Sequence, residues 1–474
     1  MTRFLFVVPP MTGHVHPTLS VAHALRSRGH QTAWVGYGQA IGHLLPATTP
    51  PTLYSLDRDL PAAFLTDMAA RARSVRGLAG LKFLWEEVLL PLGRDMLPGV
   101  EQAARSFAAD VLVVDQQAFA GAFAARRLSL PWATLATTSA DRPASLGDLP
   151  QVLAWTEQRL ADLQRELDLE PQAEPENSPS RVIVFSTPAL AGDTSSRPAH
   201  WSFVGPATGQ RNARTTPVKD EDDSDRSMAM PADARADTAP HTSAHTPPHT
   251  STHSPTSSTT DTPNDSTTPT PTDAPIDTRT DARTDSTAQP TTTTPDPERA
   301  FPWDRLSKGK RILASLGTLN AERGDRFFAA LAEGLGGDPA LQVIVVSPRD
   351  EVNGAPWPDN FIQRPWVPQL ELLPHLDAVI SHGGHNTVCE ALSEGLPLVV
   401  APIKDDQPVI AQQVVDAGCG LRLSFTRPRP ALLAEAVRRV LDEPAFAEAA
   451  EVVRASFLAA GGAPEAARLL EELA

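Results

Sequence analysis

The sequence predicts an α/β protein made of two doubly wound domains in tandem, which face a cleft and are joined by a long disordered insertion. Short apolar runs alternate with helical patterns in both halves of the chain. At 474 residues the chain is too long for one hydrophobic core, since a domain usually takes about 100–200 residues. Apolar residues form 41% of the chain and aromatic residues only 5%, which favours parallel sheets rich in Val, Ile, Leu and Ala.

The N-terminal domain is predicted over residues 1–206. Arg3–Val8 is a short apolar run typical of a buried strand, and a glycine-containing loop, Met11–Pro17, follows it. We expect Thr18 to cap a helix that Gly29 ends, and a second strand, Gln31–Val35, to complete a βαβ unit. Further elements alternate along the domain, with strands at 111–115, 132–135 and 182–185 and helices at 78–107, 119–128 and 152–167.

The middle of the chain, residues 207–300, is dominated by Thr, Pro, Asp and Ser. Such a segment cannot bury enough apolar surface to offset the entropy of ordering it, so we expect a disordered linker. The C-terminal domain, residues 301–474, repeats the plan of the first, with strands at 311–316, 341–346, 378–380 and 398–401 and helices at 326–334 and 386–394. Ligands of open α/β sheets bind beyond the carboxyl ends of the strands, so the site is expected in the loops that follow them.

The charge and the cysteine count exclude several classes of function. A formal net charge of −16 argues against nucleic acid as a partner, because that binding depends on clustered Lys and Arg. No stretch approaches the roughly 20 apolar residues that span a bilayer, so we expect no integral membrane contact. The two cysteines, Cys389 and Cys419, lie among apolar and small residues, which predicts reduced thiols in a cytoplasmic protein. We expect a monomer or a weak dimer.

The most informative segment is Ser381–Thr387, with the sequence Ser-His-Gly-Gly-His-Asn-Thr between a predicted strand and a predicted helix. Glycines allow a ligand to approach the backbone, and the free N–H groups at the start of a helix favour an anion. His382, Asn386 and Thr387 would add side-chain donors. The segment therefore predicts a cradle for a diphosphate, although the loop contains no Lys or Arg.

Polar and aromatic side chains near this segment extend the predicted site. Glu390 lies one turn further along the same helix, where its carboxylate can accept hydrogen bonds from ribose hydroxyls. Trp366 offers an indole face for a base, and Gln369 offers an amide for the ribose. Asp406 and Gln407 follow another strand, and their side chains suit the hydroxyls of a sugar.

In the N-terminal domain, His14 and Asp115 are predicted to act together. His14 lies just beyond the carboxyl end of the first strand and Asp115 at the carboxyl end of a later strand, so both face the same rim of the sheet. A histidine beside a buried carboxylate is oriented and kept basic, as the removal of a proton from an acceptor hydroxyl near neutral pH requires. The role of His16 stays open.

Together these segments resemble the donor-site signature of family 1 UDP-glycosyltransferases, above all their bacterial macrolide and natural-product branch. The resemblance is carried by Trp366-Val-Pro-Gln369, His382-Gly-Gly-His-Asn-Thr-Val-Cys-Glu-Ala-Leu392, Asp406-Gln407 and Gly13-His14-x-x-Pro17. It covers about residues 1–206 and 301–474, and the tract between them is far longer than the usual connector of the family. It implies two Rossmann-like domains (the GT-B fold), a nucleotide sugar on the C-terminal one, and inversion at the anomeric centre without a metal ion or another cofactor.

The resemblance also implies roles for the matching residues. His14 would be the catalytic base and Asp115 its partner. Trp366 would stack on the nucleobase, while Val367 would contact its edge through the backbone. The remaining donor contacts would be Gln369 and Glu390 for the ribose, His382, Gly384, Asn386 and Thr387 for the diphosphate, Asp406 and Gln407 for the transferred sugar, and Thr318 at the border of the site.

The sequence thus predicts an inverting glycosyltransferase that moves a hexose or deoxyhexose from a UDP- or TDP-sugar to a hydroxyl of a small lipophilic natural product. Its acceptor pocket is expected along Leu53–Trp85 and Ala136–Trp155, where apolar side chains mix with few charges. A nucleotide-sugar epimerase on the same fold and a non-catalytic partner of another glycosyltransferase are the alternatives. A metal site of His382, His385 and Cys389 is disfavoured, because the glycine pair interrupts the helix that would align these side chains.

Overall fold

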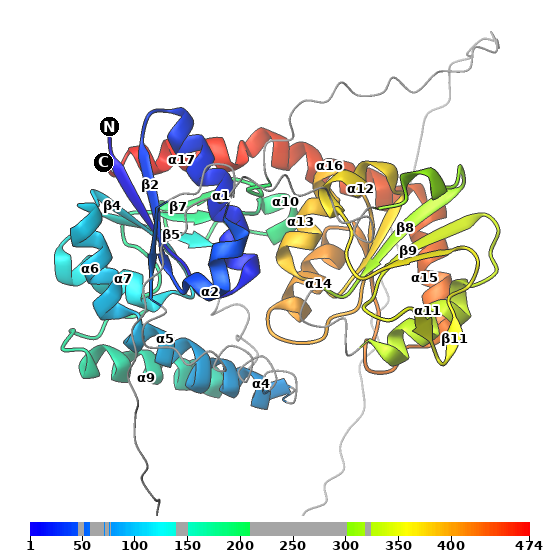
Figure 1. Cartoon of the computed structure of the whole chain (residues 1–474), viewed down its shortest axis with the longest axis horizontal. Helices are drawn as coiled ribbons and strands as arrows, with labels where there is room; N and C mark the ends of the chain where they lie inside the picture. The colour runs from blue at the N-terminus through cyan, green and yellow to red at the C-terminus, as the bar shows by residue number, and fades with distance from the viewer. Residues whose placement is uncertain are drawn as a thin grey trace, which may run out of the picture. The chain divides into compact units, whose positions relative to one another are not determined.

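The computed structural model describes residues 1–45, 52–56, 71, 75, 77–138, 150–208, 301–317 and 324–474. Its contacts group Met1–Ala213 with Pro295–Ala474 in one compact unit, which contains one large parallel sheet in each half of the chain (Figure 1). The predicted linker lies outside the described residues apart from 207 and 208. Thr318 and much of the expected acceptor pocket also lie outside them.

The N-terminal half contains a seven-stranded sheet in the order β3-β2-β1-β4-β5-β6-β7, and all its neighbouring strands are parallel. These strands are β1 (Arg3–Val7), β2 (Gln31–Gly36), β3 (Thr52–Ser55), β4 (Val111–Asp115), β5 (Trp132–Ala136), β6 (Val182–Val184) and β7 (Trp201–Phe203). Every residue of β4, β5 and β6 is buried, which explains why these strands form continuous apolar runs in the sequence. The strand order reverses between β1 and β4, so the crevice where ligands bind is expected at their carboxyl ends.

The helices of this half are α1 (Thr12–Ser27), α2 (Gly38–Ile41), the 3-10 turn η1 (Gly42–Leu44), α4 (Gly77–Phe83), the π-helical turn η3 (Leu84–Leu89), α5 (Leu90–Asp95), α6 (Leu97–Phe107), α7 (Phe119–Leu128), α9 (Pro150–Glu166) and α10 (Pro188–Ala191). The single helix predicted at 78–107 is therefore four consecutive helical segments. Pro91 and Pro98 lie in the first turns of α5 and α6, where the missing N–H of proline is tolerated but the preceding helix is interrupted.

The start of α1 also differs from the sequence prediction. The helix begins at Thr12 and includes the segment that was expected to be a loop, with Pro17 in its interior. Thr18 is not a cap, because its hydroxyl donates to the Val15 carbonyl at 2.7 Å and accepts from Trp34 Nε1 at 2.9 Å. His14 therefore lies in the first turn of a helix, and its position is set by helical geometry.

The C-terminal half contains a six-stranded sheet in the order β12-β9-β8-β13-β14-β15, again parallel throughout. Its strands are β8 (Lys310–Ser315), β9 (Leu341–Val346), β12 (Phe361–Arg364), β13 (Ala378–Ser381), β14 (Leu398–Val400) and β15 (Gly420–Arg422), and a small antiparallel hairpin is formed by β10 (Glu351–Val352) and β11 (Ala355–Pro356). The strand order reverses between β8 and β13. The two doubly wound sheets predicted from the sequence are thus confirmed.

The helices of the C-terminal half are η4 (Trp303–Arg305), α11 (Asp325–Leu335), α12 (Gln369–Leu372), η6 (Leu373–His375), α13 (His385–Ser393), α14 (Gln407–Asp416), α15 (Pro430–Asp442), α16 (Pro444–Ala460) and α17 (Gly462–Glu471). None of the helices in the described part of the chain is long and apolar enough to cross a membrane.

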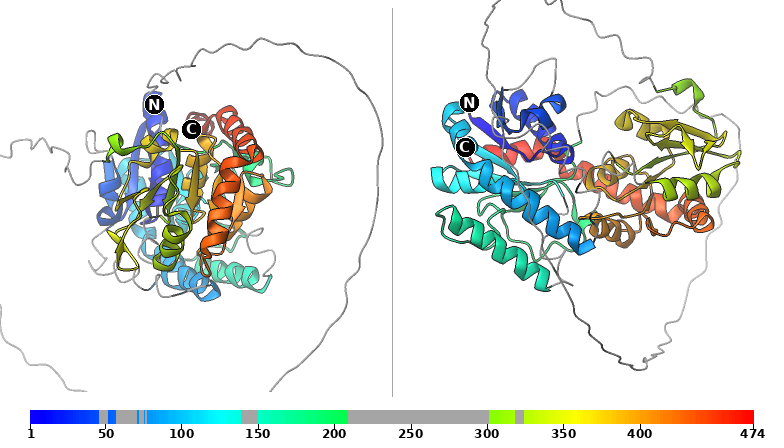
Figure 2. Two further views of the ribbon diagram at one scale, coloured as in Figure 1. Left: turned by 90° about the vertical axis from the view of Figure 1, so that its right-hand side faces the viewer. Right: turned by 60° about the horizontal axis from the view of Figure 1, so that its bottom comes forward.

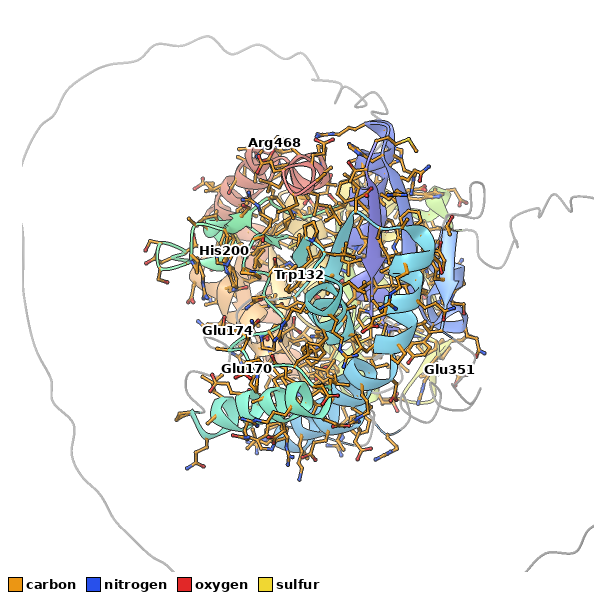
Figure 3. The ribbon with its side chains drawn as sticks, turned by 90° about the vertical axis from the view of Figure 1, so that its left-hand side faces the viewer. Trp132, Glu170, Glu174, His200, Glu351 and Arg468 are labelled. Carbon is orange, nitrogen blue, oxygen red and sulfur yellow. The ribbon has the colours of Figure 1, made fainter. Side chains whose placement is uncertain are left out.

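The last helix, α17, packs on the sheet of the other half. Ala466 and Leu470 belong to the same buried apolar cluster as Phe4 and Phe6 of β1. At the end of α17, Glu471 pairs with Arg28 at 2.8 Å. Figures 1 and 2 show both ends of the chain at this side of the N-terminal sheet. Figure 3 labels Arg468, which belongs to α17, and Trp132, a buried residue at the start of β5. The last helix of the chain is therefore part of the core of the N-terminal half.

Candidate active site

Two side chains predicted to act together meet at the switch point of the N-terminal sheet. His14 extends from the first turn of α1, directly after β1, and Asp115 is the last residue of the neighbouring strand β4. His14 Nδ1 lies 3.0 Å from both carboxylate oxygens of Asp115. The Asp115 side chain is fully buried, and 11% of the His14 side chain remains exposed, so only the imidazole is accessible to a ligand.

A third residue, Thr137, completes this group and was not singled out from the sequence. Its hydroxyl donates to Asp115 Oδ2 at 2.6 Å, and its oxygen lies 2.9 Å from His14 Nδ1. Thr137 follows β5, the neighbour of β4, so the rule that strand ends meet at one edge of a sheet would have found it. Because Nδ1 faces two oxygen acceptors, the neutral ring carries its proton there and presents Nε2 as the basic nitrogen.

The pKa of His14 results from opposed effects. Burial, the largest effect, lowers the pKa, but the charge of Asp115, the hydrogen bond to Asp115 and the charge of Asp406 outweigh it. The net result is a pKa above the ordinary value of 6.5. Asp406 comes from the C-terminal half of the chain, so side chains of both halves tune this base.

The glycines that follow β13 enclose an imidazole. Gly383 has φ +85°, a left-handed conformation that favours glycine. A Cβ atom added at Gly384 would lie 2.7 Å from His382 Nε2, and one added at Gly317 would lie 2.6 Å from His382 Cε1. Neither distance is tolerable, so the absence of side chains at Gly317 and Gly384 is what allows the ring of His382 to pack between them.

His382 is buried and uncharged at neutral pH. Burial, partly opposed by a hydrogen bond to the Ser315 backbone, lowers its pKa to about 4. Its Nδ1 atom has no hydrogen-bond partner among the described residues. The adjacent helix α13 begins at His385 without a side-chain cap, so its first N–H groups also lack a side-chain acceptor. Unpaired donors at the positive end of a helix form a site that favours an anion.

Two side chains in the first turn of α13 bond to carbonyl groups of the N-terminal half. Asn386 Nδ2 donates to the Gly13 carbonyl at 2.9 Å, and His385 Nε2 donates to the Phe185 carbonyl at 3.0 Å. The Cys389 thiol lies 3.5 Å from His385 Nε2 and also faces Phe185. His385 and Cys389 are fully buried by these contacts, which lowers the pKa of His385 and raises that of Cys389.

The residues predicted to hold a nucleoside lie along α12 and α13. Gln369 Nε2 donates to Glu390 Oε2 at 2.5 Å, so these two side chains are brought together. Trp366 precedes them with 58% of its surface exposed, which leaves its indole face open for stacking. Val367 is buried in the apolar core of this half, so only its backbone can meet a ligand.

Asp406 and Gln407 mark the start of α14. The side-chain oxygen Oε1 of Gln407 accepts from the N–H groups of Ile403 at 2.9 Å and Lys404 at 3.1 Å. Those bonds fix the orientation of the amide, so its NH2 group is the part that remains for a ligand. The Gln407 side chain can therefore only donate a hydrogen bond to a sugar hydroxyl, and the oxygen of that hydroxyl accepts it.

Of the segments expected to line the acceptor pocket, the structure describes mainly the ends. Trp85 and Trp155 come from these two segments and pack edge to face, with ring centroids 6.3 Å apart. Trp85 also contacts Phe119 of α7, with ring centroids 5.8 Å apart. An aromatic cluster thus joins the two segments.

Comparison with known proteins gives relatives over part and over all of the chain. Residues 339–473 match the family described as erythromycin biosynthesis protein CIII-like, C-terminal domain. The chain is 24% identical over 475 residues to 4'-demethylrebeccamycin synthase of Lentzea aerocolonigenes, with 99% of each protein covered. It is 34% identical over 169 residues to the uncharacterized UDP-glucosyltransferase YojK of Bacillus subtilis (strain 168), which covers 35% of this chain and 41% of YojK.

Solved structures share the fold over the whole chain. The glycotransferase of kitacinnamycin superposes with a TM-score of 0.67 at 20% identity and covers 100% of this chain and 98% of its own. The glycosyltransferase VinC, solved in complex with dTDP, gives a TM-score of 0.62 at 16% identity, with 100% and 99% covered. These likenesses confirm the predicted GT-B class of fold.

Proposed function

We propose, from the premise that this chain is a relative of the natural-product glycosyltransferases and shares their GT-B fold, that it is an inverting glycosyltransferase. Its donor is a UDP- or TDP-sugar that carries a hexose or deoxyhexose, and its acceptor is a hydroxyl of a small lipophilic natural product. Residues 1–206 bind the acceptor and residues 301–474 bind the nucleotide sugar. The protein is cytoplasmic and a monomer or weak dimer, as the sequence predicts.

One observation carries the proposal: the residue before the buried base is bonded to the first turn of the helix that begins the expected anion site. Asn386, in the first turn of α13, bonds to Gly13, which immediately precedes His14. A diphosphate at the start of α13 would therefore lie beside the residue whose Nε2 can take a proton. An inverting transfer requires this arrangement, since the acceptor attacks the anomeric carbon from the side opposite the leaving group.

The base acts on the acceptor. His14 Nε2 removes the hydroxyl proton as the acceptor oxygen forms its bond to the anomeric carbon. Asp115 and Thr137 hold the ring with Nδ1 turned inward, and the Asp115 charge stabilises the imidazolium that results. The bond from the anomeric carbon to the diphosphate oxygen breaks at the same time, and its electron pair leaves on the nucleoside diphosphate.

Residues of the C-terminal half stabilise the negative charge that develops on the leaving nucleoside diphosphate. The first N–H groups of α13 are preorganised donors, and such stabilisation is usually the largest single contribution to catalysis. The uncharged ring of His382 packs beside them. Gly384, Asn386 and Thr387 complete the diphosphate site. We assign the nucleobase to Trp366 and Val367, the ribose to Gln369 and Glu390, and the sugar to Asp406 and Gln407, and no step requires a metal ion.

The test is a product screen. Purified protein is incubated with a panel of UDP- and TDP-sugars and with polyketide, carotenoid and phenolic acceptors, and products are identified by mass spectrometry and NMR. We expect a glycoside whose anomeric configuration is inverted relative to the donor. A donor-only arm that yields an epimeric nucleotide sugar would identify an epimerase instead. Failure to bind UDP or TDP, together with activation of another glycosyltransferase, would identify an auxiliary partner.

A further inference from the structure

We propose that Asn386 is a positioning residue that ties the donor site to the catalytic base. Its side-chain amide holds the first turn of α1, which carries His14, against the first turn of α13. This inference rests on the proposed function, and it adds a role for Asn386 that is separate from contact with the diphosphate.

The bond exists because of a proline. In an α-helix the N–H of residue 17 would donate to the carbonyl of residue 13, but Pro17 lies inside α1 and has no N–H. The Gly13 carbonyl is thereby left without its helical donor. Asn386 Nδ2 supplies the missing donor at 2.9 Å, from a residue 373 positions away in the chain.

The fit around this bond is close. A Cβ atom on Gly13 would lie 3.6 Å from Asn386 Nδ2, so the Asn386 side chain lies at ordinary van der Waals distance from this position of α1. The adjacent residue of α13, His385, makes the parallel bond to the Phe185 carbonyl at 3.0 Å. Gly13 follows β1 and Phe185 follows β6, so the start of α13 is fixed to two places on the same edge of the N-terminal sheet.

The consequence concerns His14. Its backbone N–H donates to the Met11 carbonyl at 3.0 Å, so the turn that Asn386 holds includes the base itself. Without the Asn386 bond, Gly13 loses its protein donor at the start of α1, where the helix also has no side-chain cap. A looser turn misplaces Nε2 relative to the anomeric carbon while the donors for the diphosphate stay in place.

This gives Asn386 a kinetic signature that differs from that of a phosphate ligand. Loss of positioning lowers kcat, because misplacement of a catalytic group by about 1 Å costs up to about 100-fold. Loss of a phosphate contact weakens binding of the nucleotide. Thr387→Ala provides the comparison, because Thr387 is in the same turn of α13 and is assigned only to the diphosphate, whereas the hydrogen bond to Gly13 comes from Asn386.

The experiment uses the full chain and four variants: Asn386→Ala, Thr387→Ala, Pro17→Ala combined with Asn386→Ala, and the control Ser393→Ala. Ser393 lies at the far end of α13 and donates only to the Cys389 carbonyl. Pro17→Ala restores an N–H that can bond to the Gly13 carbonyl within α1. We measure kcat, the Kd of UDP and TDP by calorimetry, and amide hydrogen exchange of residues 10–18 without ligand.

We expect Asn386→Ala to lower kcat by about 10-fold or more, in addition to any rise in nucleotide Kd from its lost diphosphate contact, and to speed exchange in residues 10–18. Pro17→Ala should recover part of both losses, Thr387→Ala should raise Kd without changing the exchange, and Ser393→Ala should match wild type. If Asn386→Ala does not fold, Asn386→Leu keeps the volume and removes the same donor.

Unchanged exchange of residues 10–18 in Asn386→Ala would overturn the proposal, and so would a loss confined to nucleotide Kd that Pro17→Ala does not rescue. The exchange measurement needs no ligand. It therefore decides the role of Asn386 even if the wild-type protein binds neither UDP nor TDP, a result that would overturn the proposed function instead.

Discussion

Replacement of Asp115 by Asn keeps the shape of the side chain and removes its charge. In the wild type its carboxylate accepts from His14 Nδ1, the Thr137 hydroxyl and the Gln117 N–H. The amide oxygen is expected on the Gln117 N–H at 2.8 Å, so the NH2 group replaces Oδ2, which lies 3.0 Å from His14 Nδ1. An NH2 group there favours the tautomer of His14 that accepts a hydrogen bond at Nδ1. The proton of the neutral ring moves to Nε2, the nitrogen that has to remove the acceptor proton.

The expected loss is large and confined to catalysis. A carboxylate-to-amide change that fixes the wrong tautomer of a catalytic imidazole lowers kcat by up to about 10⁴-fold, equivalent to about 5 kcal/mol of transition-state stabilisation. Within the described part of the chain, the hydrogen bonds of Asp115 go to His14, Gln117 and Thr137, and none of these residues is assigned to the nucleotide sugar. The Kd of UDP or TDP should therefore stay within about threefold. Initial rates of nucleoside diphosphate release and calorimetry measure the two quantities.

Asp110→Asn is the matched control. Asp110 immediately precedes the same strand and pairs with Arg3 at 2.8 Å, but both side chains are 39% exposed. Such exposed pairs contribute little to stability because water screens their charges, and Asp110 has no assigned role in catalysis, so kcat should not change. The reasoning is refuted if Asp115→Asn keeps more than about a tenth of the wild-type kcat, or if its defect lies in nucleotide affinity.

Three further predictions follow from the same geometry. The acidic limb of the kcat/KM profile should lie above pH 6.5, because transfer needs uncharged His14 and its pKa is raised above that value; a limb at lower pH contradicts this. Uncharged His382 should stabilise the fold above pH 6.5, and this contribution should be lost as the pH falls to about 4. Urea unfolding of wild type should therefore lose up to about 3 kcal/mol more over that range than His382→Asn does, and equal losses would refute the assignment. Gly384→Ala should raise the Kd of UDP by about 10- to 100-fold, since its Cβ would lie 2.7 Å from His382 Nε2 and push this ring and the start of α13 apart; unchanged affinity would show that the packing of this ring does not shape the nucleotide site.

The strands could be predicted well because buried parallel strands are continuous apolar runs. The boundaries of β4 and β9 need no information beyond the local sequence. The start of α1 could not be predicted, because Gly13 and Pro17 are locally typical of a loop. The proline is accommodated by a donor, Asn386, from the distant C-terminal half.

In the site, too, the local sequence predicts some features, while others depend on contacts between residues distant in the chain. The residue types of His14, Asp115 and the segment after β13 indicate their chemistry, and the topology brings His14 and Asp115 together. Thr137 was missed although its place at a strand end is readable from the sequence. The packing of α17 could not be deduced, because an amphipathic pattern shows which face is buried but not which sheet covers it.

A crystal structure of the wild-type protein with UDP or TDP would examine most directly whether the first turn of α13 holds the pyrophosphate next to the base. We predict phosphate oxygens at the backbone N–H groups of residues 385–387 and beside His382. The nucleobase should stack on Trp366, and the terminal phosphate should point towards His14 Nε2. A nucleotide bound elsewhere, or an imidazole turned away from that phosphate, would contradict the account.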